Sequence, residues 1–140
     1  LAQHRHLLET LSADDRRHVA VAARNNRAAA VRTMLAVGFP VDATGQHEGT
    51  PLHWAAFHGN AEMTREILKY NPPLEKTDRD FKGTPLGWAV HGSEHGWHTK
   101  TGDYASVVGL LLAAGAKPSE NSSKGTEAVR AVLRRFKGSS

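Results

Sequence analysis

Apolar and polar positions along this chain fall into pairs of short helical segments that are joined by polar turns. In the clearest pair, residues 50–57 are followed by a Gly-Asn turn and then by Met63, Ile67 and Leu68 at helical spacing. Apolar residues three and four positions apart lie on one face of a helix. The pattern therefore predicts a helix, a tight turn and a second helix in this part of the chain.

The same pair of helices recurs elsewhere. Residues 19–23 and 31–35 match the first and second helix of a preceding unit, and residues 107–112 match the second helix of a later one. The segment TPLHWAA at residues 50–56 also returns as TPLGWAV at residues 84–90. Self-similarity at a regular spacing of this kind indicates a repeat architecture in which neighbouring units stack on one another.

This layout resembles the ankyrin repeat closely, and we expect a domain of the bacterial type. The signature T-P-L-H-x-A is complete at residues 50–55, and residues 84–89 carry it with Gly87 in place of the histidine. The resemblance covers about residues 14–137. It implies an all-α solenoid of stacked ankyrin helix-turn-helix repeats with β-hairpin finger connections. It also implies that His53 hydrogen-bonds near the threonine of its own signature and links neighbouring repeats.

The whole chain is predicted to form a single ankyrin repeat domain. Its parts are an N-terminal capping helix at 1–13, repeat 1 at 14–49, repeat 2 at 50–83, repeat 3 at 84–125 with an insertion at 93–102, and a C-terminal capping half-repeat at 126–140. We expect Leu52 and Leu86 to be buried between repeats. Trp54 and Trp88 stand where the family usually has leucine, so we expect them in the core with ring edges that reach the concave surface.

The third repeat is stretched by its insertion. The stretch from Thr84 to Thr126 is longer than the stretch from Thr50 to Thr84, and alignment places the surplus between the two helices at residues 93–102. Insertions in repeat proteins lie in loops, often on the binding face. The inserted Trp97 either packs back onto the body near Trp88 or faces a partner, and both alternatives remain open.

The connection at residues 78–83 is the second departure from a regular repeat. In ankyrin repeats this stretch forms a finger, and here it has one residue more than usual, which adds Phe81. Asp78, Asp80 and Gly83 also stand at the first, third and sixth positions of a calcium loop. The bidentate glutamate expected at the twelfth position is missing, so we reject calcium binding.

Histidines gather around the insertion, at His91, His95 and His98. Zinc sites use histidine and carboxylate ligands, so the residue types suit a metal. Gly92 and Gly96 interrupt the stretch, however, so no His-x3-His pair lies on an assured helix, and we expect no metal and no cofactor. Nucleotide-binding, metalloprotease and hydrolase motifs are absent from the sequence, so we expect no catalytic residues and no enzymatic activity.

Composition narrows the range of functions further. The 140 residues are 39% hydrophobic and include no cysteine, which fits one globular domain without disulfides. The formal net charge is +4, with both ends of the chain basic and residues 41–123 net acidic. Because this distribution does not form one basic stripe, we expect no nucleic-acid partner. The longest apolar run, at residues 107–116, is too short to cross a bilayer, so we expect no membrane partner. The absence of cysteine suits a cytoplasmic location, and we expect a monomer.

These features, together with the resemblance, predict a non-enzymatic protein–protein interaction module. The fingers and first helices of an ankyrin stack form one concave surface for a protein partner. The positions that the resemblance assigns to partner contact, together with the inserted tryptophan, are Gln46, His47, Phe57, His58, Arg79, Asp80, Phe81, Lys82, His91 and Trp97. Two alternatives remain, a regulatory domain of an enzyme or transporter complex and a small-molecule or metal site beneath the insertion at 93–102.

Overall fold

The computed structural model describes residues 16–118 and 125–138. Within these residues the chain forms seven α-helices, one short 3-10 helix and no β-strand. The elements, in chain order, are α3 (His18–Arg24), α4 (Ala28–Ala36), η1 (Gln46–Glu48), α5 (Pro51–His58), α6 (Ala61–Leu68), α7 (Pro85–His95), α8 (Tyr104–Ala114) and α9 (Glu127–Gly138).

Five of these helices begin at a side chain that satisfies a backbone N–H of the first turn; for α9 it is Thr126, whose Oγ1 accepts from the Val129 N–H at 3.4 Å. Thr50 and Thr84 cap α5 and α7, and each is followed by a proline at the first helical position. Asn60 caps α6 and Asp103 caps α8, with acceptor distances of 3.0 and 3.2 Å to backbone nitrogens. Such caps replace hydrogen bonds that the first turn of a helix cannot make internally. The helix boundaries therefore follow from the local sequence.

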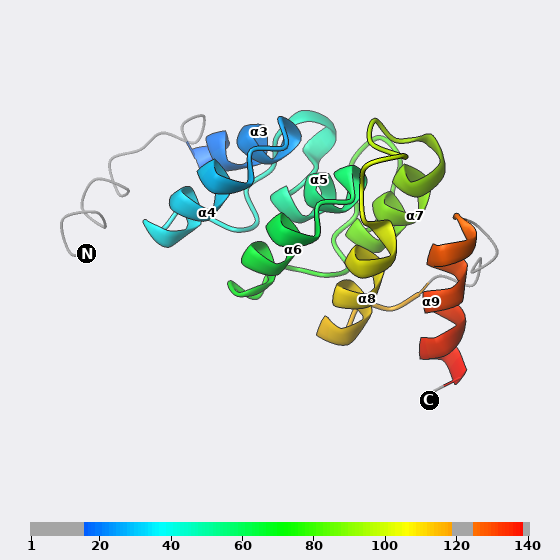
Figure 1. The fold of residues 1–140 in the computed structure, drawn as a ribbon. Coiled ribbons are helices and arrows are strands. Elements are labelled where there is room, and N and C mark those ends of the chain that lie inside the picture. Colours follow the sequence, from blue (N-terminus) through cyan, green and yellow to red (C-terminus); the bar gives the residue numbers. More distant parts are fainter. Residues whose placement is uncertain (1–15, 119–124, 139–140) are drawn as a thin grey trace.

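The helices are arranged in two layers (Figure 1). Helices α3, α5 and α7 stack side by side in the first layer, and α4, α6 and α8 stack in the second. Each pair from one repeat is antiparallel and joined by a short turn, except where a longer loop joins α7 to α8. The last helix, α9, packs against α8 at the end of the stack. This arrangement confirms the all-α solenoid predicted from the sequence.

The core lies between the layers and between successive repeats. Leu52 is fully buried and Leu86 is only 4% exposed, as the repeat register predicts. Met63 and Ile67 from α6 and Val107 from α8 are also fully buried. Because each repeat covers the apolar side chains of its neighbour, the core is continuous along the stack.

His53 links two repeats in the way that the resemblance implies. Its Nδ1 accepts from the Thr50 N–H at 3.1 Å, so the proton of the neutral ring is on Nε2, which donates to the Gly83 carbonyl at 2.9 Å. Burial lowers the pKa of His53 below its ordinary value of 6.5, against the opposing effect of the Gly83 carbonyl. The histidine is therefore a neutral, structural residue that ties the second repeat to the following finger.

The predicted β-hairpin form of the fingers is wrong for the connections that the structure describes. The first finger (residues 42–49) contains η1, and the second finger (residues 76–83) is closed by a bond from the Asp78 N–H to the Gly83 carbonyl at 3.1 Å. One backbone bond joins the fingers, from the Arg79 N–H to the His47 carbonyl at 2.9 Å. Left-handed residues lie in both turns, and neither finger contains a β-strand in the described part of the chain.

The insertion also differs from the loop expected at 93–102. Residues 93–95 continue α7 by one more turn, and the loop proper covers residues 96–103. The additional helical turn supports the C-terminal unit, because Ser93 Oγ accepts from the Thr126 N–H at 3.2 Å and Glu94 Oε1 accepts from the Gly125 N–H at 2.9 Å.

The predicted capping helix at 1–13 lies outside the described residues, and the domain boundaries stay predictions. None of the helices in 16–118 and 125–138 combines the length and the apolar character that crossing a bilayer requires.

Candidate functional site

Equivalent side chains of the second and third repeats line up across the first layer. Trp54 in α5 corresponds to Trp88 in α7, one repeat later, and Phe57 corresponds to His91 in the same way. These helix positions face the two fingers, where His47 corresponds to Phe81. The repeat therefore places aromatic and imidazole rings from two helices and two fingers on one surface.

These rings surround a cleft with a volume of about 420 Å³. We call it the aromatic cleft. It is lined by His47, Trp54, Phe57, Phe81, Gly83, Gly87, Trp88, His91 and Trp97. The rings meet mostly edge to face. Trp54 and Trp88 lie 4.9 Å apart between ring centroids at 89°, and Phe81 meets Trp88 at 6.3 Å and 77°. Such perpendicular contacts are favoured between aromatic rings and leave flat faces as walls.

Gly87 also lines the aromatic cleft. It stands where the second repeat has His53, whose ring crosses to the following finger. A Cβ atom built at Gly87 would meet only Thr84 Oγ1, at 3.6 Å, so the glycine lies beside open space. By the same repeat offset, a histidine at position 87 would extend toward residue 117 and not toward the second finger, so the departure from the signature motif leaves open space on the C-terminal side of α7.

Trp97 from the insertion forms one wall of the cleft. Its ring packs on the second repeat, with centroid distances of 5.1 Å to Phe57, 5.6 Å to His58 and 6.0 Å to Trp54. The side chain nevertheless stays 58% exposed. Trp97 therefore packs back on the body near Trp88, on Trp54 and Phe57, which both contact Trp88. Contact of its exposed face with a partner stays a prediction.

The loop that carries Trp97 is fixed at its far end. Tyr104 donates its hydroxyl to the Phe57 carbonyl at 2.7 Å, and the Asp103 N–H donates to the Gly59 carbonyl at 2.8 Å. Gly92 makes room for this contact, since a Cβ atom there would lie 2.5 Å from the Phe57 oxygen and 3.0 Å from the Tyr104 ring. Burial raises the pKa of Tyr104 to about 12, so the hydroxyl stays a donor at physiological pH.

Charged groups of the two fingers form one rim of the cleft. His47 Nδ1 lies 2.5 Å from Asp80 Oδ2, and Arg79 Nε donates to Asp80 Oδ1 at 3.2 Å. Arg79 also lies 3.9 Å from Glu48. The bond from His47, followed by the one from Arg79, lowers the pKa of Asp80. The finger charges therefore largely neutralise one another.

The ten residues predicted for partner contact fall into three groups. His47, Phe57, Phe81, His91 and Trp97 line the aromatic cleft. Gln46, Arg79, Asp80 and Lys82 are exposed on the fingers but do not line it. His58 is a correction, because it is only 2% exposed.

The reason for the burial of His58 is a bond between repeats. Its Nε2 lies 2.8 Å from the Arg24 carbonyl of the preceding repeat, which makes this nitrogen the donor. Trp54 and Trp97 cover the ring. Burial lowers the pKa of His58, with the bond to Arg24 as the opposing effect. His58 is therefore a neutral residue of the core.

Arg24 is the residue near the cleft that sequence reasoning missed. Its Cζ lies 5.6 Å from the centroid of Trp97 and 5.9 Å from that of Trp54. The signal was present, since Arg24 occupies the position in the first repeat that His58 occupies in the second. The contact with Trp97 depends on the path of the insertion, which the sequence pattern does not specify.

The histidines of the insertion need a second correction. His91 and His95 both lie on α7, four residues apart, with ring centroids at 5.1 Å. A His-x3-His pair on a helix is therefore present, contrary to the expectation. Within the part of the chain that the structure describes, no group of three or more histidine, cysteine or acidic side chains is placed to hold a metal ion.

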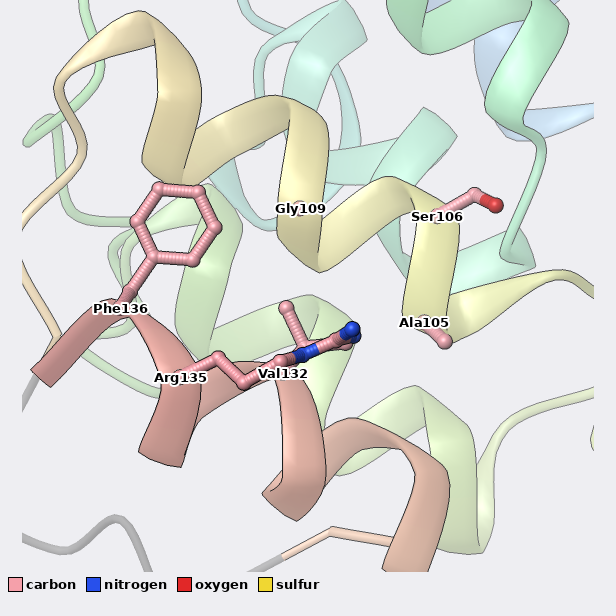
Figure 2. A pocket seen from close by; sticks show the side chains of 6 residues that line it. All are labelled: Ala105, Ser106, Gly109, Val132, Arg135 and Phe136. Atoms are coloured by element: carbon pink, nitrogen blue, oxygen red, sulfur yellow. The ribbon is translucent and has the colours of Figure 1, made fainter. Parts of the chain in front are cut away.

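A second hollow lies between the last two helices (Figure 2). It has a volume of about 500 Å³ and is lined by Ala105, Ser106, Gly109, Val132, Arg135 and Phe136. Small residues of α8 face Val132 and Phe136 of α9, so the hollow follows from the lack of large side chains on α8. It brings together few groups that recognise a ligand, and we place the candidate site at the aromatic cleft.

Comparison with known proteins agrees with this architecture. The family model described as "Ankyrin repeats (3 copies)" matches residues 18–122. The chain belongs to the ankyrin repeat family. Ankyrin repeats serve as protein–protein interaction modules, and the fold is generally non-catalytic.

The relatives of this ankyrin chain include three palmitoyltransferases. Palmitoyltransferase Hip14 of Drosophila melanogaster is 30% identical over 101 residues, which cover 72% of this chain and 14% of that protein. Palmitoyltransferase ZDHHC17 of Homo sapiens is 33% identical over 81 residues, covering 57% of this chain and 11% of that protein. Putative palmitoyltransferase ZDHHC13 of Danio rerio is 25% identical over 88 residues, which cover 63% of this chain and 12% of that protein. The chain thus spans a small part of each relative.

Among solved structures, the human ASB11 ankyrin repeat domain is similar, with a TM-score of 0.64 and 20% sequence identity. The similarity covers 84% of this chain and 53% of that chain, and it shows the fold alone. None of these relatives tests the bacterial type of the domain, which stays a prediction.

Proposed function

We propose that this chain binds a protein partner through the aromatic cleft and performs no catalysis itself. The observation that supports this is the exposure of large rings around a cleft, with Phe81 exposed by 69% and Trp97 by 58%. Contiguous exposed apolar surface with a polar rim is typical of interaction sites. Tryptophan and other aromatic side chains in a recess are the usual anchors of protein interfaces.

The shape of the cleft favours a protruding side chain of the partner. Trp54 and Trp88 form its buried floor, at 3% and 7% exposure, while Phe81 and Trp97 are its exposed walls. A rigid floor needs no reordering when a partner binds, which lowers the entropic cost of association. The exposed finger residues Arg79 and Asp80 would then contact polar groups of the partner at the rim.

A second candidate is a regulatory segment within a larger enzyme. The relatives support it, since the matching regions cover 14% or less of proteins described as palmitoyltransferases. In this case the cleft would bind a substrate or regulator of another domain of the same protein. A cytoplasmic location, a monomeric state and the absence of nucleic-acid and membrane partners stay predictions under both candidates.

Site-specific photo-crosslinking tests the proposal. A photoreactive phenylalanine analogue at Phe81 should crosslink a protein in a lysate of the source cells. The same analogue at Tyr70, which is 41% exposed and follows α6 of the second layer, serves as the control and should not crosslink it. Equal crosslinking at both positions would place the interaction outside the aromatic cleft and contradict the proposal.

A further inference from the structure

We propose that the partner segment carries an acidic side chain that binds Arg24, beside the apolar residue that occupies the aromatic cleft. This inference rests on the proposed function of the cleft and specifies the chemistry of the partner. Arg24 adjoins the cleft, because its guanidinium lies over Trp97 and Trp54, which both line it.

The first argument is that the partly buried charge of Arg24 has no carboxylate partner among the described residues. Its Nε is buried without a hydrogen-bond partner. Its side-chain bond from Nη1 to Asn25 Oδ1 is long at 3.5 Å, and no ion pair with Arg24 occurs among residues 16–118 and 125–138. A guanidinium removed from water is costly unless a carboxylate or similar acceptor pairs with it. Within the described residues no carboxylate pairs with this guanidinium, and we propose that the partner supplies one.

The second argument is the contrast with the finger rim. Arg79 on the second finger is also near the cleft, but Asp80 at 3.2 Å and Glu48 at 3.9 Å already neutralise it. For Arg24 no such carboxylate lies within ion-pair distance in the part of the chain that the structure describes. An acidic group of the partner would therefore be attracted to the Arg24 side of the cleft and not to the fingers.

The third argument is the net charge of the N-terminal part of the chain, since residues 1–40 carry six arginines against Glu9, Asp14 and Asp15, a net of +3. Within the described residues 16–41 the charged side chains are all arginines. These arginines are Arg16, Arg17, Arg24, Arg27 and Arg32. A partner with acidic character is steered to such a surface, and a planar guanidinium pairs well with a carboxylate. The occupant of the cleft is a side chain of a peptide, so the carboxylate belongs to an aspartate or glutamate of the same segment.

Peptide selection followed by affinity measurement tests this inference. A random peptide library displayed on phage is selected on the wild-type domain, and a binding peptide is titrated by fluorescence anisotropy. We expect the selected peptides to combine a large apolar residue with a nearby acidic one. Arg24→Gln should weaken binding about tenfold or more, because hydrogen bonds to charged groups are among the stronger ones. Arg27→Gln, which removes the same charge from an exposed position, should change affinity less than about twofold.

Two further measurements make the test specific. Replacing the acidic residue of the peptide by its amide should weaken binding to wild type and leave binding to Arg24→Gln unchanged. Added salt should weaken the wild-type complex more than the Arg24→Gln complex. Circular dichroism of each variant checks that the repeats stay folded.

The outcomes separate this inference from the proposed function. If selected peptides lack acidic residues and bind Arg24→Gln as tightly as wild type, the inference is wrong, and the proposed function stands as long as Phe81→Ala weakens binding. If Phe81→Ala and Phe57→Ala leave affinity unchanged, the peptide binds elsewhere and the proposed function fails. A library that yields no binding peptide counts against both.

Discussion

Trp88 donates its indole Nε1–H to the buried carboxylate of Asp78 at 2.9 Å, whereas the equivalent Trp54 buries the same group without an acceptor. The difference lies one repeat earlier, since Thr44 occupies the position that corresponds to Asp78. Asp78 also accepts from the N–H groups of Phe81 at 2.6 Å and Gly83 at 2.7 Å. One carboxylate thus fixes both the second finger and the floor of the aromatic cleft.

The substitution Thr44→Asp should give Trp54 the acceptor that it lacks. We expect the free energy of unfolding to rise by about 1 kcal/mol, because a buried donor would gain a charged partner. Urea unfolding followed by circular dichroism measures the change. The gain should vanish in a Trp54→Phe background, which has no indole donor. An equal gain in that background would mean that Thr44→Asp acts through the finger alone.

The pH dependence of stability should report on Asp78. Burial raises its pKa, but the bonds from Phe81, Trp88 and Gly83 outweigh burial and leave the pKa below the ordinary value of 3.8. The folded chain therefore binds this proton less readily than the unfolded chain. The stabilisation is complete above the unfolded pKa and is lost as the pH falls through the folded one.

The variant Asp78→Asn isolates this contribution. It should lower the free energy of unfolding by about 2 kcal/mol at neutral pH, because one buried donor loses its acceptor. The difference in the free energy of unfolding between Asp78→Asn and wild type should narrow as the pH falls below 3.8. Asp42→Asn, at an exposed position of the first finger, is the matched control. A gap that stays constant with pH would show that the Asp78 carboxylate is not what stabilises the finger.

Buried histidine should make the domain less stable in mild acid. Burial lowers the pKa of His58 below the ordinary 6.5, so the unfolded chain takes up a proton that the folded chain excludes. This contribution to stability is complete above the unfolded pKa and declines as the pH falls below it toward the lower folded pKa. In His58→Gln the amide can still donate to the Arg24 carbonyl. Urea unfolding of this variant should show a shallower decline of the free energy of unfolding with falling pH. His18→Gln, at an exposed position, should leave the slope unchanged. An unchanged slope in His58→Gln would mean that His58 titrates normally in the folded state.

The sequence predicts the repeat units better than it predicts the site. The helix pairs and the burial of Leu52 and Leu86 follow from helix-capping residues and from the regular spacing of the repeat. Both signals can be read directly from the amino-acid sequence. The contacts of His58 and Arg24 lie between repeats. The exposure of a residue there depends on what its neighbour contributes, and a pattern within one repeat does not contain that information.

The course of the insertion was hardest to predict. Residues 93–95 extend α7 because Ser93 and Glu94 accept hydrogen bonds from the C-terminal unit, which a count of surplus residues does not reveal. Trp97 turns toward the second repeat because Tyr104 and Gly92 bring the loop close to Phe57. Both outcomes depend on contacts between residues that are distant in the sequence.

Trp97→Ala tests how the insertion contributes to binding. The ring packs on Phe57, His58 and Trp54 yet remains 58% exposed, so its loss should destabilise the fold by only about 1 kcal/mol. Loss of one cleft wall should weaken the complex with a selected peptide by about 1–3 kcal/mol. Trp97→Phe keeps a ring on the second repeat, so it should recover part of the fold stability and part of the peptide affinity. Melting temperature and peptide affinity are measured on the same samples. If melting falls while affinity is unchanged, the insertion is a structural cover for His58, and the cleft binds its partner through Phe57, Phe81 and Trp88 without it.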